Sequence, residues 1–319
     1  MATKAIKQNT VTASRIFGDY IIMLIAPCIL SVIYYGSRAV AVIAVSALSA
    51  VLCDFAANFM LKRSFLLRDP SNIFVGLAIA VMMPAGVPLY VPAIASAAGV
   101  LTAKIPFGSS LRAPFVPAAA GFAIASVCFK EQVFTYTQNT EDKLFGANSL
   151  ASMLAQGTPV RINIGNVFDV ISGNISGPMG TGCGILMVVC CGYLFVRTRS
   201  ALLATAGFIG ACAVFAMISP RVSAPLFVSV VLELSAGSLL FGAVFLVTDH
   251  ATLPKGGVMK VIYGAVCGTI CMFMRKIGTY EETVCFAVLM ANGISPVLES
   301  AVKNLPSLSK SKKKEAAEK

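Results

Sequence analysis

Long apolar runs separated by short polar stretches fill most of the chain. A helix needs about 20 predominantly apolar residues to cross a bilayer, or somewhat fewer when it is short or broken. The pattern predicts ten membrane helices, at residues 20–35, 39–60, 72–84, 88–104, 114–129, 180–196, 201–218, 224–247, 258–274 and 283–300. Gly or Pro interrupts several runs, notably near Pro84 and Pro114, and such breaks persist in a membrane only where protein or a cavity satisfies the freed backbone. We therefore predict an all-α polytopic membrane protein.

The polar interval 130–179 divides the ten helices into two groups of five. The predicted parts are an N-terminal segment 1–19, a first membrane half 20–129, the polar loop 130–179, a second membrane half 180–300 and a basic tail 301–319. An internal echo links the halves, because aligning Gly76 with Gly242 also brings Pro88 onto Pro254. With five spans per half, the second copy begins on the opposite membrane face, which predicts two inverted five-helix repeats.

Composition and charge agree with a membrane protein and suggest its orientation. The chain is 57% apolar and 12% charged, whereas soluble domains carry about 25% charged residues. Most Lys and Arg residues, Lys104 among them, fall on one side when both termini are placed in the cytoplasm, with Arg275 and Lys276 as exceptions on the outer side beside Glu281 and Glu282. We expect a multi-pass protein of the cell (plasma or inner) membrane, without a cleaved signal peptide. The net charge of +11 needs no nucleic acid, because a basic tail beside anionic lipid accounts for it.

The cysteines and the single histidine offer little support for a metal site built by this chain alone. Almost all ten cysteines lie inside apolar runs, which favours buried thiols over disulfides or zinc ligands. Cys267 and Cys271 are one helical turn apart, which leaves open an iron shared with another subunit. The sequence contains no GxGxxG followed by an acidic residue, no P-loop and no CxxCxxC run. The chain is therefore not expected to oxidise NADH or hold an iron–sulfur cluster without partners.

Residues 232–299 carry a family resemblance. The stretch LELSAGSLLFGAVFLVTDHATLP, its G-x-x-x-G helix and the later ETVCFAVLMANGISP are similar to the C-terminal half of the D subunit of Rnf electron-transport complexes. Looser matches at LLRDPSNIFVGLAIAVMMP and SSLRAPFVPAAAGFA extend the resemblance over roughly residues 20–300. The related B subunit of the sodium-translocating NADH:quinone reductase shares this architecture. The resemblance implies a subunit that passes electrons between ferredoxin and NAD, coupled to sodium or proton movement, with iron–sulfur and flavin subunits as partners.

The family also implies an FMN linked through phosphate to a threonine in an S/T-G-A-T sequence, on the outer side after the fifth helix. The corresponding run is FGAN, in which Gly146 and Ala147 match but Phe145 replaces Ser/Thr and Asn148 replaces the acceptor threonine. An amide nitrogen cannot form the phosphoester, and Ser149 offers a hydroxyl one position later. The family's G-x-x-G-E-T-S before the sixth helix is also changed, at residues 177–183. We expect a divergent member that binds FMN or riboflavin without a covalent bond, or no flavin, with attachment at Ser149 left open.

Ionisable residues inside predicted spans are expensive, on the order of 2.5–3.5 kcal/mol each on insertion scales, so each suggests a function. Thr248 and Asp249 keep the family's T-D pair, whereas His250 replaces the usual proline, and Asp249 either shapes a flavin pocket or caps a turn. Asp54 and Glu233 are candidates for an ion path, and interhelical hydrogen bonds are the alternative for both.

The leading interpretation is a membrane subunit of an Rnf-like ferredoxin/NAD electron-transport complex that couples electron transfer to cation translocation. Such a subunit is part of a translocase and has no catalysis of its own. Two alternatives remain, a small-solute channel or transporter on the same scaffold, and a scaffold subunit without a cofactor. A fold alone does not separate these functions.

Overall fold

The computed structural model describes residues 2–62, 70–136, 149–155, 171–173, 177–221, 225–278 and 282–303, and their side chains apart from those of 2–13, 152, 153 and 155. The first half contains α1 Ala2–Tyr35, α2 Ser37–Met60, α3 Ser71–Met82, α4 Tyr90–Gly99 with its continuations η1 Val100–Lys104 and η2 Ile105–Phe107, η3 Ser110–Arg112 and α5 Pro117–Cys128. Two short helices follow, α6 Lys130–Val133 and α7 Leu150–Ala155. The second half contains α9 Gly184–Arg197, α10 Leu202–Ile218, α11 Leu226–Ser235, α12 Leu239–Phe241, η4 Gly242–Leu246, α13 Gly257–Ile277 and α14 Val284–Lys303.

The ten predicted segments are all helical, but they differ in length. Within the described residues, five helices are long and apolar enough to cross a membrane: Ser14–Tyr35, Ser37–Met60, Tyr90–Phe107, Gly257–Ile277 and Val284–Val302. A sixth span is a pair of helices, Leu226–Ser235 and Leu239–Leu246, bent by 71° at its break. The remaining segments form shorter apolar helices, namely α3, α5, α9 and α10. The first helix begins earlier than predicted, at Ala2, because the polar N-terminal segment contains no Pro or Gly before Gly18 to end it.

The two halves repeat one scheme of helix packing. In the first half α3 packs against α1, α2 and α5, while α4 packs against α2 and α5. In the second half η4 packs against α9, α10 and α14, while α13 packs against α10 and α14. Each of these five pairings of the first half therefore has its counterpart among the corresponding helices of the second.

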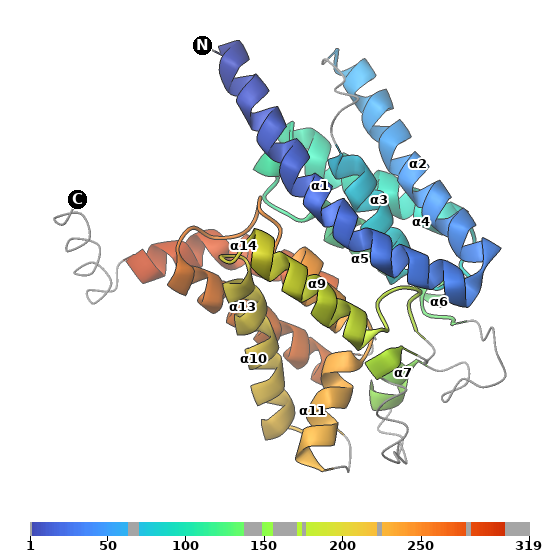
Figure 1. Cartoon of the computed structure of the whole chain (residues 1–319), viewed down its shortest axis with the longest axis vertical. Helices are drawn as coiled ribbons and strands as arrows, with labels where there is room; N and C mark the ends of the chain where they lie inside the picture. The colour runs from blue at the N-terminus through green and yellow to red at the C-terminus, as the bar shows by residue number, and fades with distance from the viewer. Residues whose placement is uncertain are drawn as a thin grey trace.

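The first helices of the two halves run in opposite directions. Asp19 of α1 contacts Arg197 near the end of α9, whereas Met23, further along α1, accepts a hydrogen bond from Cys190, nearer the start of α9. Figure 1 shows α9 lying beside α1 with this antiparallel course. Together with the repeated packing, this arrangement agrees with the predicted inverted repeat. The aligned glycines do not occupy equivalent surroundings, because Gly76 faces the backbone of Ala47 in α2 whereas Gly242 faces the side chain of Val284 in α14.

At the predicted break near Pro84, other parts of the protein provide hydrogen bonds for the unpaired backbone carbonyl groups. After α3 ends, the carbonyl oxygens of Val81 and Met83 accept hydrogen bonds from the backbone N–H groups of Gly180 and Met179, at 3.1 and 3.0 Å. Gly180 lies close to Val81 and Ser31, so a Cβ atom there would overlap both side chains. A segment from the polar interval thus supplies the donors that a broken membrane helix requires.

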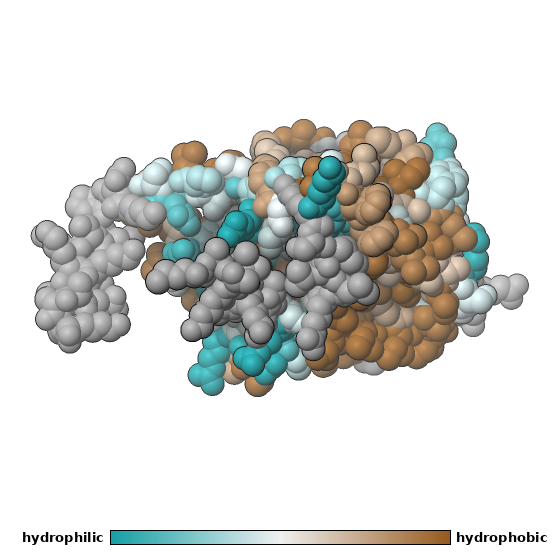
Figure 2. Space-filling model, turned by 90° about the horizontal axis from the view of Figure 1, so that it is seen from above, coloured by the Kyte–Doolittle hydropathy of each residue, from teal (hydrophilic) through white to brown (hydrophobic). Residues whose placement is uncertain are grey.

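The exposed surface is apolar where the long helices face outward. Ile22, Ile29 and Ile33 of α1 and Leu52 and Phe59 of α2 are all more than half exposed. Figure 2 shows a broad area of apolar residues on the side where α1 and α2 lie, with polar residues gathered elsewhere. In a membrane protein such a surface faces lipid or the apolar surface of another subunit.

Small residues allow α10 and α13 to pack closely, as the G-x-x-x-G pattern predicts. A Cβ atom on Gly264 would lie 2.0 Å from the carbonyl oxygen of Ala204, and one on Gly268 would lie 2.6 Å from that of Phe208. The Sγ atom of Cys212 also reaches the carbonyl of Gly268, at 3.7 Å. Backbone atoms cannot move aside as a flexible side chain can, so these positions require glycine.

Replacing Gly264 with alanine is therefore expected to destabilise the protein by about 1–3 kcal/mol, the usual cost of overpacking. Gly210 provides the matched control, because it lies on the same helix pair but is exposed, and a Cβ atom there would meet no other atom within 4 Å. Gly210→Ala should be neutral or stabilising by up to about 1 kcal/mol, because alanine is the better helix former. Thermal unfolding of the two variants in one detergent compares them, and an equal midpoint for both would contradict the packing argument.

Candidate functional site

The eighth segment breaks between α11 and α12, and a buried carboxylate holds the break. Gly237 has a left-handed backbone with φ of 63°, and a Cβ atom there would collide with Oε1 of Glu282. The backbone N–H of Ser238 donates to both oxygens of Glu282, at 3.0 and 2.9 Å, and the Ser238 hydroxyl donates to the same carboxylate. The start of a helix carries unpaired N–H groups and a partial positive charge, so a carboxylate stabilises it there.

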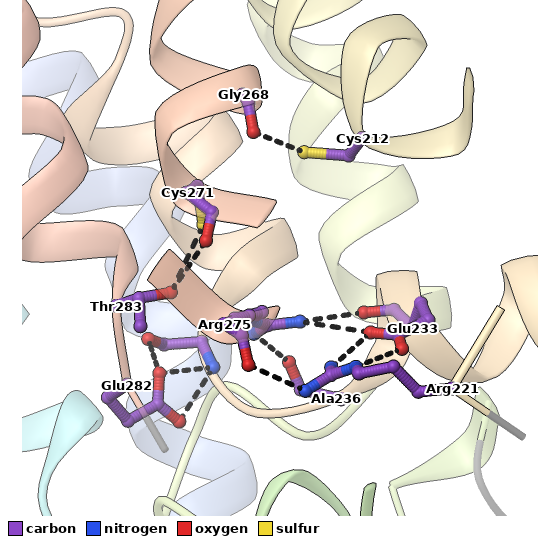
Figure 3. A network of polar contacts seen from close by, with 10 residues as sticks. Cys212, Arg221, Glu233, Ala236, Gly268, Cys271, Arg275, Glu282 and Thr283 are labelled. Carbon is purple, nitrogen blue, oxygen red and sulfur yellow. Dashed lines mark hydrogen bonds and ion pairs between the residues drawn. The ribbon is translucent and has the colours of Figure 1, made fainter. Parts of the chain in front are cut away.

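Two arginines surround Glu233 on the other side of this break (Figure 3). Arg221 donates to Glu233 through two nitrogens, Nε to Oε1 at 2.6 Å and Nη2 to Oε2 at 2.5 Å. Arg275 donates to the carbonyl oxygens of Glu233 and Ala236, at 2.9 and 2.8 Å, which are the carbonyls left unpaired where α11 ends. Glu233 and Arg275 are almost fully buried, whereas Arg221 is partly exposed. This cluster connects the loop after α10 with α11 and α13.

Four cysteines lie buried in the same part of the second half, namely Cys212, Cys267, Cys271 and Cys285. Figure 3 shows Cys271 one turn before Arg275, where its Sγ atom lies 3.4 Å from the Thr283 hydroxyl and its carbonyl accepts from that hydroxyl. All ten cysteines of the chain are free thiols. They serve here as small apolar side chains in the packing.

The first half contains a comparable buried cluster around Asp54. Lys104 at the end of η1 lies 3.3 Å from Oδ1 of Asp54, and it also donates to the side-chain oxygen of Asn72. Asn72 in turn donates to Oδ2 of Asp54 at 2.9 Å. All three side chains are buried, and they join α2, α3 and η1. The Arg221–Glu233–Arg275 cluster joins the corresponding helices of the second half, so each half carries one charge-paired cluster.

Thr248 and Asp249 lie in the turn that follows η4, packed against α1. Tyr20 donates its hydroxyl to the carbonyl of Thr248 at 2.8 Å and lies 3.1 Å from the Thr248 hydroxyl. Asp249 accepts from the backbone N–H of Ala251 at 3.3 Å, so its carboxylate caps the turn. Burial raises the pKa of Asp249 to about 6, because desolvation disfavours the charged form, and the N–H groups of Ala251 and His250 oppose this shift. The carboxyl group can therefore gain or lose a proton near neutral pH.

The raised pKa of Asp249 makes the stability of the fold depend on pH. The folded protein holds the proton of Asp249 more tightly than the unfolded chain does. The resulting contribution to the free energy of unfolding is therefore complete below about pH 4 and is lost as the pH rises through about 6. The rise of the pKa of Asp249 from 3.8 to about 6 corresponds to a contribution to folding stability on the order of 3 kcal/mol. We expect the unfolding midpoint of the wild type to fall across this range relative to Asp249→Asn, whose side chain stays neutral. Thermal unfolding of both proteins at several pH values tests this, and parallel curves would contradict it.

The segment that corresponds to the flavin-attachment motif lies only partly within the described structure. Gly146, Ala147 and Asn148 fall outside the described residues, whereas Ser149 is 2% exposed at the start of α7. Leu150 and Leu154 of α7 pack in one cluster with Leu232 and Ala236 beside the break in the eighth segment. A flavin transferase needs access to the acceptor hydroxyl, and a phosphoester needs room outside it, so buried Ser149 does not fit a covalent FMN.

Sequence reasoning identified the buried acids but not their partners. The prediction placed Lys104 and Arg275 in the aqueous regions on either side of the membrane, whereas the structure buries both against carboxylates or carbonyls. Glu282 was expected beside Arg275 on the outer side, and it is instead buried against Ser238. A basic residue in the last turn of an apolar helix, opposite an acid in another helix, is the signal that would have suggested these pairs.

Comparison with known proteins places the sequence of this chain in a family. The model of the NQR2, RnfD and RnfE family matches residues 1–306. The chain is 23% identical to the D subunit of the proton-translocating ferredoxin:NAD(+) oxidoreductase complex of Clostridium ljungdahlii, over 94% of this chain and 96% of the relative. It is 24% identical to the D subunit of the Na(+)-translocating complex of Acetobacterium woodii, over 92% of this chain and 90% of the relative. A shorter match, 37% identical over 28% of this chain and 24% of the relative, is to the D subunit of an ion-translocating oxidoreductase complex of Yersinia pestis.

Proposed function

Because the chain belongs to the NQR2, RnfD and RnfE family, we propose that it is the D-type membrane subunit of an Rnf-like complex that couples electron transfer between ferredoxin and NAD to cation movement. The observation that carries this proposal is the match along more than nine-tenths of the chain to two relatives named as the D subunits of such complexes. The repeated packing of the two halves supports it, because transporter folds often combine two inverted repeats around a central site.

The proposal assigns redox chemistry to partner subunits and ion-related chemistry to this chain. Iron–sulfur and flavin subunits supply the electron carriers. Within this chain, two charge-paired clusters fix the helices of each half, and Asp249 has a pKa near neutrality that suits proton binding. We place both termini in the cytoplasm, which puts Asp19, Arg197 and the turn at Asp249 near that side.

We further propose that this chain carries no covalent flavin at Ser149. Asn148 lacks the hydroxyl that the family's acceptor position requires, and Ser149, directly before α7, is buried. FMN or riboflavin held without a covalent bond would be released from the denatured protein, so a denaturing gel viewed under ultraviolet light should show no fluorescent band for this chain.

Purification of the tagged chain from its native membranes tests the proposed function. Iron–sulfur and flavin subunits should copurify, and membranes lacking this chain should lose ferredoxin-dependent NAD reduction together with the associated cation movement. A chain that purifies without redox partners, from membranes whose ferredoxin:NAD activity survives its deletion, would favour the solute channel or transporter instead.

A further inference from the structure

A small cavity lies where the two halves meet, between α1, α9 and the turn after η4. Its polar lining consists of Asp19, Tyr20, Tyr193, Arg197, Thr198 and His250. The volume of about 30 Å³ is enough for one or two water molecules, and a water needs two or more polar partners to stay in such a space. The lining provides them from three separate elements of the fold.

The outer wall of the cavity is an ion pair at the solvent boundary. Arg197 donates to Asp19 through Nη2 at 2.7 Å and through Nε at 3.2 Å, and the Tyr193 hydroxyl lies 3.5 Å from Oδ1 of Asp19. The Arg197 side chain is 54% exposed and that of Asp19 is 26% exposed. Water therefore reaches the cavity beside a carboxylate that can accept a hydrogen bond from it.

The inner wall leads toward the buried turn. Nδ1 of His250 lies 3.5 Å from the Tyr20 hydroxyl, and the two rings meet edge to face. Tyr20 is buried and donates to Thr248, the residue that precedes Asp249. The imidazole thus stands between the cavity and the acidic turn, joined to both through polar atoms.

The charges around His250 come from every side of the cavity. Burial lowers the pKa of His250 below its ordinary value, Lys260 on α13 lowers it further, and Asp19 on α1 opposes both by favouring the protonated imidazole. Arg197 on α9 faces the same cavity and is paired with Asp19, and Asp249 is the neighbouring residue in the turn. Histidine changes its charge near neutral pH, so modest shifts of this kind decide whether it carries a proton.

We propose that this cavity is a water-filled proton-exchange site, in which His250 exchanges protons with solvent water beside the turn that holds Asp249. The unprotonated imidazole nitrogen takes a proton from a hydronium ion in the cavity, which leaves as water, and the imidazolium returns the proton to a second water, which leaves as hydronium. No electron moves and no covalent bond outside the transferred O–H and N–H bonds changes. The use of this site in cation translocation rests on the proposed function, whereas the exchange itself is a property of the chain alone.

The single histidine of the chain makes a direct test possible. Full-length protein labelled with ¹³C and ¹⁵N at histidine, in lipid nanodiscs, gives one imidazole signal that belongs to His250. We expect this signal to titrate within the pH range at which the fold is kept, with a pKa below the ordinary histidine value because of burial, and to exchange magnetisation with water. Asp19→Asn should lower the pKa of His250, and Lys260→Gln should raise it. Arg38→Gln, an exposed substitution that lies 19 residues beyond Asp19 along the chain, should leave it unchanged.

Several results would overturn the proposal. A signal that stays constant over this pH range, that shows no exchange with water, or that ignores both Asp19→Asn and Lys260→Gln would each do so. Thermal unfolding of every variant shows whether the fold has been kept. In the complete complex reconstituted in liposomes, His250→Gln should slow proton movement across the membrane. The same variant complex in detergent should keep its ferredoxin:NAD electron transfer. Because the spectroscopic test needs no partner subunit, failure of the proposed complex and failure of the exchange site give different results.

Discussion

Glu233→Gln is expected to destabilise the protein by about 3–5 kcal/mol, the usual cost of removing one partner from a buried ion pair. Glu233 receives two hydrogen bonds from Arg221 and lies 3.9 Å from Nη1 of Arg275. Glutamine keeps the size of the side chain but removes the charge, so two guanidinium groups would face each other without a carboxylate. The fall in the thermal unfolding midpoint of the purified protein measures the effect.

Asp19→Asn is the matched control, because it removes the same kind of charge from an ion pair at the surface. Exposed ion pairs contribute little to stability, so its midpoint should change only slightly. A combined Glu233→Leu and Arg221→Met variant should recover part of the loss, since apolar residues of similar volume often replace an ion pair at little cost and Arg275 keeps its bonds to the carbonyls of Glu233 and Ala236. The importance of the cluster would be refuted if Glu233→Gln were no more damaging than Asp19→Asn.

Restoring the family's acceptor sequence is expected to change the cofactor state from no covalent flavin to nearly one per chain. The double variant Phe145→Ser and Asn148→Thr converts FGAN at residues 145–148 into SGAT. Threonine supplies the hydroxyl that forms the phosphoester, and serine restores the first position of the motif. After coexpression with the flavin transferase of an Rnf-type system, a denaturing gel should show a fluorescent band only for the variant.

The single variants and Ser149→Ala complete this experiment. Asn148→Thr alone tests whether the transferase tolerates Phe145, and Ser149→Ala in the restored chain should leave the band intact because Ser149 is buried. A fluorescent band from the wild type that disappears in Ser149→Ala would show that this serine is the acceptor and would overturn our assignment.

The pattern of apolar runs predicts the positions of the helices because each run must satisfy its own backbone in lipid. All ten segments are helical, and the Gly and Pro signals near Pro84 and after Thr248 mark real ends of helices. The echo of Gly76 and Gly242 correctly indicates the repeated packing, although the two glycines face different neighbours. Local patterns therefore predict the helical elements.

The pairing of buried charges was not predictable in the same way. Glu233 and Arg275 are 42 residues apart, and no local periodicity joins them. The rule that places Lys and Arg in aqueous regions fails for Lys104 and Arg275, because each finds an acid or a carbonyl inside the protein. The break between Ser235 and Leu239 was also hidden within one predicted helix, since it depends on Glu282 far along the chain. Such contacts come from tertiary structure rather than from sequence periodicity.

The distance along the chain between Glu233 and Arg275 also has a consequence for the biogenesis of this protein. A ribosome completes α11 well before it synthesises the residue that satisfies the carbonyls of Glu233 and Ala236. Until then a ten-residue helix with a glutamate is too short and too polar to remain stably in lipid. Asp54 differs, because α2 is long and apolar enough to cross a membrane by itself although the lysine partner of Asp54 follows 50 residues later. We therefore expect stable insertion of α11 to wait for α13, so that the insertion machinery handles these helices as a group.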